Sequence, residues 1–199
     1  MVVGFDIDDT LTDKKQYCID LCEKYFEETG KRYNLLDENA ELMTKMYDWT
    51  FDEFMICWNK KGQEYLDNLP VRKEAKLVFD ILRAQGNKIV IITQRYTMNP
   101  YETSDKWLKK NGLSYDTLVV EAKDKVEACR LHKVDCYVDD RISTCDSLNS
   151  SGVKAFVINT YFNTKTLSQS PRVNSLIEYY NQIKNNNQII LKNQNERIL

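Results

Sequence analysis

The sequence predicts an α/β fold, in which a doubly wound parallel sheet of about five strands carries an all-helical cap inserted after the first strand. Short apolar, β-branched runs recur along the chain without polar alternation, which is typical of strands buried on both faces. These runs are VVGF (2–5), KIVIIT (88–93), TLVVEA (117–122), VDCYV (134–138) and VKAFVIN (153–159). Helical patterns separate the later runs, so right-handed βαβ connections are expected.

Three helices are predicted between the later strands. Residues 72–86 place their apolar side chains on one helical face and end at Gly86, a residue type that commonly closes helices. Residues 101–112 end at Gly112 in the same way, and residues 123–133 form the third helix. The alternation of strand and helix is what a doubly wound sheet requires.

The region between the first strand and residue 70 has no strand signal. Three stretches have helical patterns, and Asp37 and Thr50 are candidate N-caps. The stretches are 14–30, 36–49 and 50–70. Because insertions at the carboxyl end of a strand lie over the ligand crevice of an open α/β sheet, we expect this insert to act as a lid.

The predicted division of the chain is a core, a cap and a tail. The core comprises residues 1–13 and 71–184, and the helical cap comprises residues 14–70. The core is expected to end in a helix within residues 171–184. The Asn- and Gln-rich residues 185–199 are expected to form a weakly ordered tail.

Composition narrows the functional classes. The net charge of −2 gives no reason to expect a nucleic-acid polymer as partner. No apolar run approaches the roughly 20 residues of a membrane span, and the N-terminus lacks the pattern of a signal peptide. A cytoplasmic protein without a membrane partner is expected, with its six cysteines as reduced, packed thiols. The sequence does not indicate an oligomeric state.

The stretch DIDDTLTD, residues 6–13, places acidic side chains directly after the first predicted strand. Neighbouring carboxylates repel one another, and burial strengthens the repulsion. A divalent cation is the usual compensation. Asp6 and Asp8 are two residues apart, so both can reach the crevice at the carboxyl edge of the sheet.

Other polar residues occur where further strands end or helices begin. Thr93 ends the second strand, Lys125 begins a helix, and Asp139 and Asp140 end a later strand. The carboxylates offer the oxygen ligands that Mg²⁺ prefers. The hydroxyl, the ammonium and backbone N–H groups are suited to a phosphoryl group.

These motifs resemble those of the haloacid dehalogenase (HAD) superfamily of phosphohydrolases. DIDDTLTD resembles the first motif, IITQR the second, Lys125 the third and VDD the fourth, over roughly residues 1 to 160. The helical insert, LPVRKEAK and DKVEACRLHKVDCYVDDR resemble more narrowly the 5'(3')-deoxyribonucleotidase-like branch. The resemblance implies a Rossmann-like core and a Mg²⁺-dependent phosphatase for a small phosphorylated substrate.

The resemblance also implies roles for individual residues. Asp6 would be the nucleophile that forms an aspartyl phosphate, and Asp8 would be the general acid and base. Thr93, the N–H of Gln94, and Lys125 would bind the phosphoryl oxygens. Mg²⁺ would be held by Asp6, the backbone carbonyl of Asp8, Asp140 and Asp139, with Asp140 favoured as the direct ligand.

Several alternatives remain open at this point. Lys123 competes with Lys125 as the phosphate-binding lysine. Arg95 and Arg141 either reach the substrate or form structural ion pairs with the acidic cluster. Trp49 and Phe51 either stack on a nucleobase or belong to the core of the cap.

The function also has alternatives. Nucleoside monophosphates are the leading substrate class, and another small phosphoester, such as a sugar phosphate, is the alternative. A catalytically silent binding module is a third reading, but such a module would not need the acid–base residue Asp8.

Overall fold

A computed structural model describes residues 1–95 and 97–184 and confirms the predicted α/β class. Its parallel sheet has six strands in the order β3-β2-β1-β4-β5-β6. The strands are β1 (Val2–Phe5), β2 (Lys88–Ile92), β3 (Thr117–Val119), β4 (Cys136–Asp139), β5 (Lys154–Ile158) and β6 (Arg172–Val173). The connection order reverses between β1 and β4, which is where ligands bind in doubly wound sheets.

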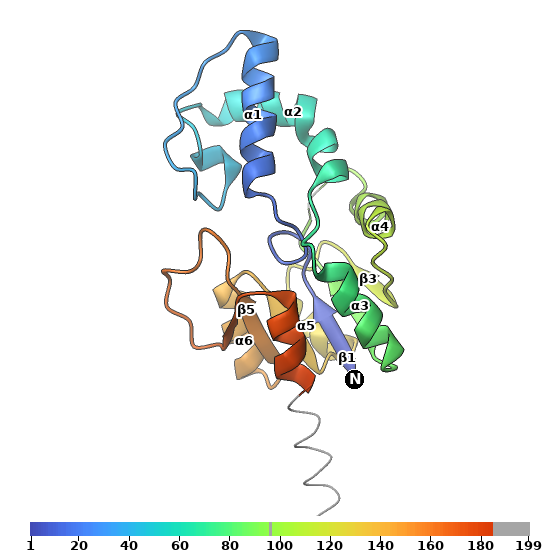
Figure 1. Cartoon of the computed structure of the whole chain (residues 1–199). Coiled ribbons are helices and arrows are strands. Elements are labelled where there is room, and N and C mark those ends of the chain that lie inside the picture. The colour runs from blue at the N-terminus through green and yellow to red at the C-terminus, as the bar shows by residue number, and fades with distance from the viewer. Residues whose placement is uncertain (96, 185–199) are drawn as a thin grey trace, which may run out of the picture.

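Helices cover both faces of this sheet (Figure 1). They are α3 (Ala75–Ala84), α4 (Pro100–Lys110), α5 (Lys125–Leu131) and α6 (Ile142–Ser150), and residues 176–184 are also helical. Alternate residues of β2 enter two different apolar clusters, with Ile89 and Ile91 in one and Val90 and Ile92 in the other. The continuous apolar runs of the sequence are therefore strands buried on both faces, as predicted.

Two elements differ from the predicted set. The sequence indicated about five strands, whereas the structure has the additional two-residue strand β6, which pairs with β5. Helix α6 was not among the three predicted helices, because its ISTCDSLNS sequence is rich in Ser and Thr, which favour caps and turns. Residues 185–199 lie outside the described residues.

The insert after β1 contains α1 (Lys15–Thr29), the short 3₁₀ helix η1 (Met43–Lys45) and α2 (Phe51–Asn68). Thr50 caps α2 through a reciprocal capping box with Glu53, as its sequence position predicts. The prediction of a full helix over 36–49 is wrong. Asp37 instead accepts a hydrogen bond from the N–H of Asn39, which is a local turn rather than a helix cap.

The chain enters and leaves the cap side by side. Thr12 and Val71 form an isolated antiparallel bridge, and the N–H of Asp13 donates to the carbonyl of Pro70. The cap therefore rises from the carboxyl edge of the sheet on two adjacent connections (Figure 1). We place the boundary between core and cap at these connections, at residues 13/14 and 70/71, as a proposal.

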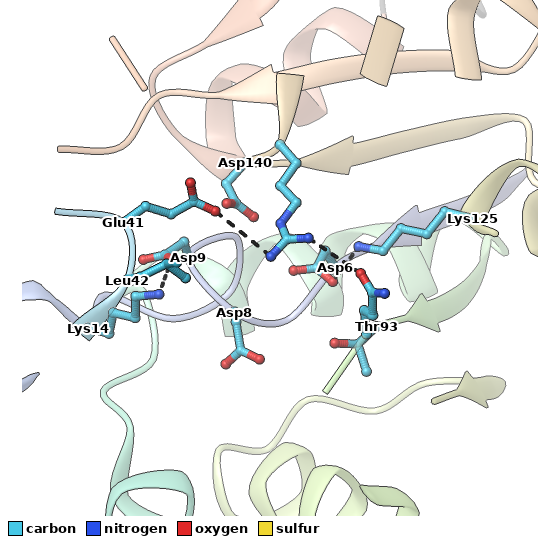
Figure 2. Close-up of a pocket in the computed structure, with 11 residues that line it drawn as sticks. Asp6, Asp8, Asp9, Lys14, Glu41, Leu42, Thr93, Lys125 and Asp140 are labelled. Atoms are coloured by element: carbon cyan, nitrogen blue, oxygen red, sulfur yellow. Dashed lines mark hydrogen bonds and ion pairs between the residues drawn. The ribbon is translucent and has the colours of Figure 1, made fainter. Parts of the chain in front are cut away.

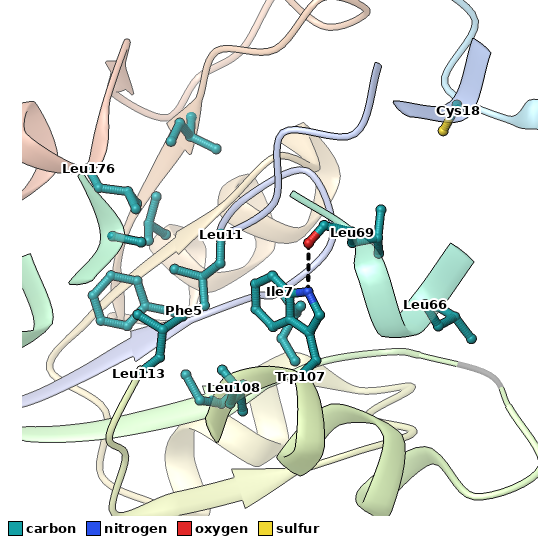
Figure 3. Packing of buried hydrophobic residues seen from close by; sticks show 14 of the residues in the cluster. Phe5, Ile7, Leu11, Cys18, Leu66, Leu69, Trp107, Leu108, Leu113 and Leu176 are labelled. Carbon is teal, nitrogen blue, oxygen red and sulfur yellow. Dashed lines mark hydrogen bonds between the residues drawn. The ribbon is translucent and has the colours of Figure 1, made fainter. Parts of the chain in front are cut away.

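Close packing inside the sheet fixes the strand that carries the acidic loop. A Cβ on Gly4 would lie 2.4 Å from the ring of Tyr137, so only glycine fits between β1 and β4 at this point. The Tyr137 hydroxyl donates to the carbonyl of Ile92 at 2.5 Å. Figure 3 shows the neighbouring apolar packing, in which Trp107 Nε1 donates to the carbonyl of Leu69 at 2.8 Å.

Among the described residues, all six cysteines are buried and unpaired. No helix in this part of the chain is long and apolar enough to cross a bilayer.

Candidate active site

The loop after β1 is held rigidly at the carboxyl edge of the sheet. The N–H of Asp6 donates to Val138 of β4, and the N–H groups of residues 10–12 all donate to the carbonyl of Ile7. Asp9 adopts a left-handed conformation with φ of 57°, and its N–H donates to Thr12 Oγ1 at 2.8 Å. Asp6 and Asp8 line the same pocket, but the Asp8 carboxylate points away from Asp6 (Figure 2).

Three carboxylates meet at the point where β1 and β4 end. Asp6, Asp139 and Asp140 each offer an oxygen within 4.8 Å of the other two, and all three side chains are buried. Lys125 Nζ donates to Asp6 Oδ1 and to Asp139 Oδ2, both at 2.7 Å. The acidic cluster therefore contains Lys125, whereas Lys123 is exposed.

The two acidic residues at the end of β4 have different partners. Asp139 accepts hydrogen bonds from Lys125 Nζ and from the N–H of Arg141. Asp140 accepts a 3.3 Å hydrogen bond from Thr10 Oγ1. Because Asp139 is already engaged with an ammonium, Asp140 is the better candidate for a direct metal ligand.

The electrostatics of the cluster leave negative charge uncompensated. Burial raises the pKa of Asp6 to about 6, against the opposing effect of Lys125. Burial, together with the neighbouring Asp139 carboxylate, also raises the pKa of Asp140 well above its ordinary value. Burial by itself would lower the pKa of Lys125, but the carboxylates of Asp6 and Asp139 raise it. Three buried carboxylates around one ammonium fit a hard divalent cation such as Mg²⁺.

Asp8 lies outside this cluster. Its two oxygens accept hydrogen bonds from the guanidinium of Arg95, at 3.0 Å from Nε and 2.8 Å from Nη2. Burial works against the charged form of Asp8, but Arg95 outweighs it and holds the pKa of that carboxyl below its usual value. The sequence left open whether Arg95 contacts the substrate or forms an ion pair with the acidic residues. In this structure Arg95 forms an ion pair with Asp8.

A small pocket of about 90 Å³ opens at the acidic cluster. The predicted phosphate-binding residues Thr93, Gln94 and Lys125 line it together with Asp6, Asp8 and Asp140. Thr93 is buried at the end of β2, where its N–H donates to Val119 of β3. Every predicted site residue except Asp139 therefore lines one pocket, and Asp139 lies behind it, bound to Lys125.

The pocket also has residues to which the sequence assigned no site role, namely Asp9, Lys14, Glu41 and Leu42. Arg141, for which a substrate contact and an ion pair were both left open, lines it as well. Glu41 comes from the cap and lies 3.8 Å from Arg141, whose Nη1 donates to Gln94 Oε1 at 3.4 Å (Figure 2). Lys14 pairs with Asp9 and follows the acidic stretch directly, which is a usable sequence signal. No sequence pattern indicates Glu41, because its position in the pocket depends on how the irregular cap loop that contains it folds over the core.

A wider cleft of about 630 Å³ adjoins the pocket and shares Glu41, Leu42, Asp140 and Arg141 with it. Residues of the cap loop between Asp37 and Lys45 line one side of this cleft, and core residues such as Phe162 and Asn163 line the other.

The aromatic candidates of the cap lie elsewhere. Trp49 is buried, its Nε1 donates to the carbonyl of Thr44, and its ring packs against Phe26, Tyr33, Tyr47 and Phe54. Phe51 is 66% exposed at the start of α2. Neither residue lines the pocket or the adjoining cleft, so the structure favours a place in the cap for Trp49 and gives no support for stacking on a nucleobase.

Comparison with known proteins supports the resemblance carried by the motifs. No family model matches the chain. A nucleotidase from Clostridium acetobutylicum is 29% identical over 183 residues, which are 90% of this chain and 88% of that protein. A Bacillus subtilis protein provisionally described as a nucleotidase is 23% identical, over 96% of this chain and 97% of its own.

Solved structures share the fold at low sequence identity. A protein from Thermotoga maritima, provisionally described as a β-phosphoglucomutase, has a TM-score of 0.68 at 15% identity, covering 92% of this chain and 98% of that one. A HAD-superfamily hydrolase of subfamily IA from Geobacter sulfurreducens has a TM-score of 0.61 at 14% identity, covering 91% and 98%. The α/β fold predicted from the alternation of strands and helices is thus confirmed, and relatives named as nucleotidases match nearly the whole chain.

Proposed function

We propose that this chain, a member of the haloacid dehalogenase superfamily by its fold and motifs, is a Mg²⁺-dependent phosphomonoester hydrolase that acts on nucleoside monophosphates. The observation that carries the proposal is the buried cluster of Asp6, Asp139 and Asp140, with Lys125 bridging two of its members. Burying so many charges is costly, and such arrangements concentrate at functional sites.

Asp6 is proposed as the nucleophile. One of its carboxylate oxygens would attack phosphorus, and the bond from phosphorus to the ester oxygen would break, leaving the phosphoryl group on Asp6. Thr93, the N–H of Gln94, and Lys125 would hold the phosphoryl oxygens. All three line the same pocket as Asp6, which supports this assignment.

Asp8 is proposed as the general acid and then the general base. It would protonate the leaving oxygen in the first step and remove a proton from the attacking water in the second. Hydrolysis of the aspartyl phosphate would release phosphate and restore the Asp6 carboxylate. Asp8 lines the pocket, although in this structure its carboxylate is held by Arg95.

Mg²⁺ would be held by Asp6, the backbone carbonyl of Asp8, and Asp140, with Asp139 as a direct or water-mediated partner. The ion would neutralise charge on the phosphoryl group in transit. An oxygen-only donor set with an excess of buried negative charge supports this choice over softer metals.

The substrate class rests on the relatives and on the cleft. Relatives with nucleotidase in their names align along almost the whole chain. The cleft of about 630 Å³ beside the pocket offers room for a nucleoside. Its many polar and charged residues also suit a sugar phosphate, which remains the second candidate.

A phosphomonoester screen tests the proposal. Wild-type protein is assayed for phosphate release from ribo- and deoxyribonucleoside 3'- and 5'-monophosphates and from sugar phosphates, with Mg²⁺ and with excess chelator. We expect release only with Mg²⁺, a preference for nucleotides, and no release by Asp6→Asn. Full activity in chelator would contradict the metal assignment, and inactivity on every phosphoester would contradict the enzyme assignment.

A further inference from the structure

We propose that Arg95 is a positioning residue that holds the Asp8 carboxylate turned away from Asp6, so that Asp8 acts on the substrate only after this contact breaks. The inference rests on the proposed function, because it gives Arg95 a part in the same reaction. It follows from the geometry of the ion pair, from the immobility of the arginine and from an unsatisfied donor.

The ion pair is a two-point contact. Arg95 Nε and Nη2 donate to different oxygens of Asp8, at 3.0 and 2.8 Å. Such a paired arrangement fixes the direction of a carboxylate as well as its charge. Figure 2 shows the Asp8 carboxylate turned away from Asp6 and Asp140. Asp8 is correspondingly absent from the group of carboxylates that converge within 4.8 Å.

Arg95 itself has little freedom to move. Its side chain is only 2% exposed, and its guanidinium lies over the ring of Trp107 at 5.6 Å from the ring centroid. Trp107 is fully buried and is fixed by the hydrogen bond from its Nε1 to the carbonyl of Leu69 (Figure 3). The Asp8 side chain is 33% exposed, so Asp8 is the partner that can leave.

The same contacts lead to the cap. Leu69 directly follows α2 and precedes the connection by which the chain returns from the cap to the core. A displacement of this connection would reach Arg95 through Trp107. Occupation of the cleft between cap and core by a leaving group could therefore loosen the hold on Asp8.

A purely structural role explains the pair less well. Arg95 Nη1 is buried and has no hydrogen-bond partner among the described residues. Buried polar groups in stabilising networks normally have all their donors satisfied. Burying a charge pair costs desolvation free energy, and hydrogen bonds compensate less of that cost when one donor is unpaired. The pair between Arg95 and Asp8 is therefore better explained by a function than by a gain in stability.

The consequence is selectivity for substrates that engage the cap. While Arg95 holds Asp8, the leaving oxygen receives no proton and the attacking water keeps its proton. A small phosphoester with an alkoxide leaving group, such as glycerol 2-phosphate, cannot fill the cleft and should be hydrolysed slowly for this reason.

A double-mutant cycle in kcat tests the positioning role. Arg95→Met keeps an unbranched side chain against Trp107 but cannot hold Asp8. We expect it to raise kcat for glycerol 2-phosphate on the order of tenfold, the value of one charge-assisted contact. In an Asp8→Asn background the same substitution should change kcat by less than about twofold. A fall in kcat with Arg95→Met, or an equal change in the two backgrounds, would overturn the proposal.

A second cycle does not depend on activity. Equilibrium unfolding of wild type, Arg95→Met, Asp8→Asn and the double variant, all without metal, should show coupling on the order of tenfold in the unfolding constant. Arg95→Lys, which keeps the charge but not the two-point contact, should lose part of this coupling. Absence of coupling would overturn the ion pair, and with it the positioning role, even in an active enzyme. An inactive wild type with full coupling would refute the proposed function and the positioning role that rests on it, and would leave the ion pair standing.

Discussion

The acidic cluster of the core and the aromatic cluster of the cap are both buried, but burial has opposite energetic consequences in them. The core buries Asp6, Asp139 and Asp140 around Lys125, although removing charges from water is costly. The cap buries Trp49 among four other rings, and burial of such apolar surface is the main favourable term in folding. Burial of charge therefore indicates function in this molecule, and burial of rings indicates stability.

The first and largest expected effect concerns the lysine in the acidic cluster. Lys125→Met leaves two buried carboxylates without their cation, so the metal-free protein should lose about 3–5 kcal/mol of unfolding free energy. Its kcat should fall on the order of 10²–10³-fold, as for loss of one donor to a transition-state oxygen. Chemical denaturation and steady-state kinetics measure the two effects.

Lys123→Met is the matched control, because Lys123 is exposed two residues away on the same segment. It should change the unfolding free energy by no more than about 0.5 kcal/mol. Comparable losses from the two substitutions would remove the distinction between these lysines.

The aromatic cluster should give the reverse pattern, a stability effect without a catalytic one. Trp49→Ala removes the central ring of the cap cluster and should cost about 3 kcal/mol. Because Trp49 lines neither the pocket nor the cleft, KM for nucleotides measured well below the melting temperature should stay within about twofold. A large rise in KM for nucleotides alone would restore the stacking hypothesis.

Phe51→Ala serves as the control for this pair. The Phe51 side chain is 66% exposed, so its removal should change stability by no more than about 0.5 kcal/mol.

The pH dependence of the metal-free protein is the third test. The pKa of Asp6 is raised to about 6 in the folded state, so its contribution is fully present below the unfolded pKa near 4 and is lost as pH rises through 6. Asp6 alone should lower the unfolding free energy by about 2 kcal/mol between pH 4.5 and 7. Burial also raises the pKa values of Asp9 and Asp140, so these two carboxyls act in the same direction. Asp8 has a lowered pKa and acts in the other direction, losing its contribution only as the pH falls below about 4.

Saturating Mg²⁺ should reduce or reverse this loss, since the cation stabilises the ionised carboxylates. Urea titrations at pH 4.5 and 7, with Mg²⁺ and with chelator, measure it. If the metal-free protein instead became more stable between pH 4.5 and 7, ionisation of the buried acidic cluster would not destabilise the folded state, and the prediction would be wrong.

The smallest expected effect is on the carboxylate assigned to the metal. Asp140→Asn removes one of three neighbouring charges, so the metal-free protein should be equally stable or more stable by about 1 kcal/mol. The rise in melting temperature that Mg²⁺ gives to wild type should be lost. Calorimetry with and without Mg²⁺ distinguishes this result from simple unfolding, and an unchanged response to Mg²⁺ would exclude Asp140 as a ligand.

The core was predictable because its signals are local. Asp6, Thr93 and Asp140 each stand at the carboxyl end of a continuous apolar run. Because parallel strands bring these ends to one edge, the three residues could be placed together from the sequence. Lys125 could be preferred over Lys123 because its spacing to Asp139 suits the family branch that the motifs resemble, and the structure places it between Asp6 and Asp139. Their catalytic roles remain proposals.

The cap was less predictable because its features depend on contacts between distant segments. Residues 36–49 contain helix-forming residues, but Leu35 bridges Tyr47, which holds the segment as a loop. That loop brings Glu41 over the pocket, a placement that no local pattern encodes. The partner of Arg95 was equally open, since either an ion pair or a substrate contact fits its position beside Thr93.

The most direct test of the central claim is to identify the residue that becomes phosphorylated. Wild type, Asp6→Asn and Asp8→Asn are mixed with Mg²⁺ and an aryl phosphate, quenched in acid and analysed by intact-protein and peptide mass spectrometry. A good leaving group needs no proton donor, so Asp8→Asn should form the aspartyl phosphate and then accumulate it, because the base for hydrolysis is missing. We predict one added phosphoryl group on Asp6 in Asp8→Asn and none in Asp6→Asn. Phosphate trapped on Asp6→Asn, or mapped to a serine, threonine or cysteine, would contradict the account.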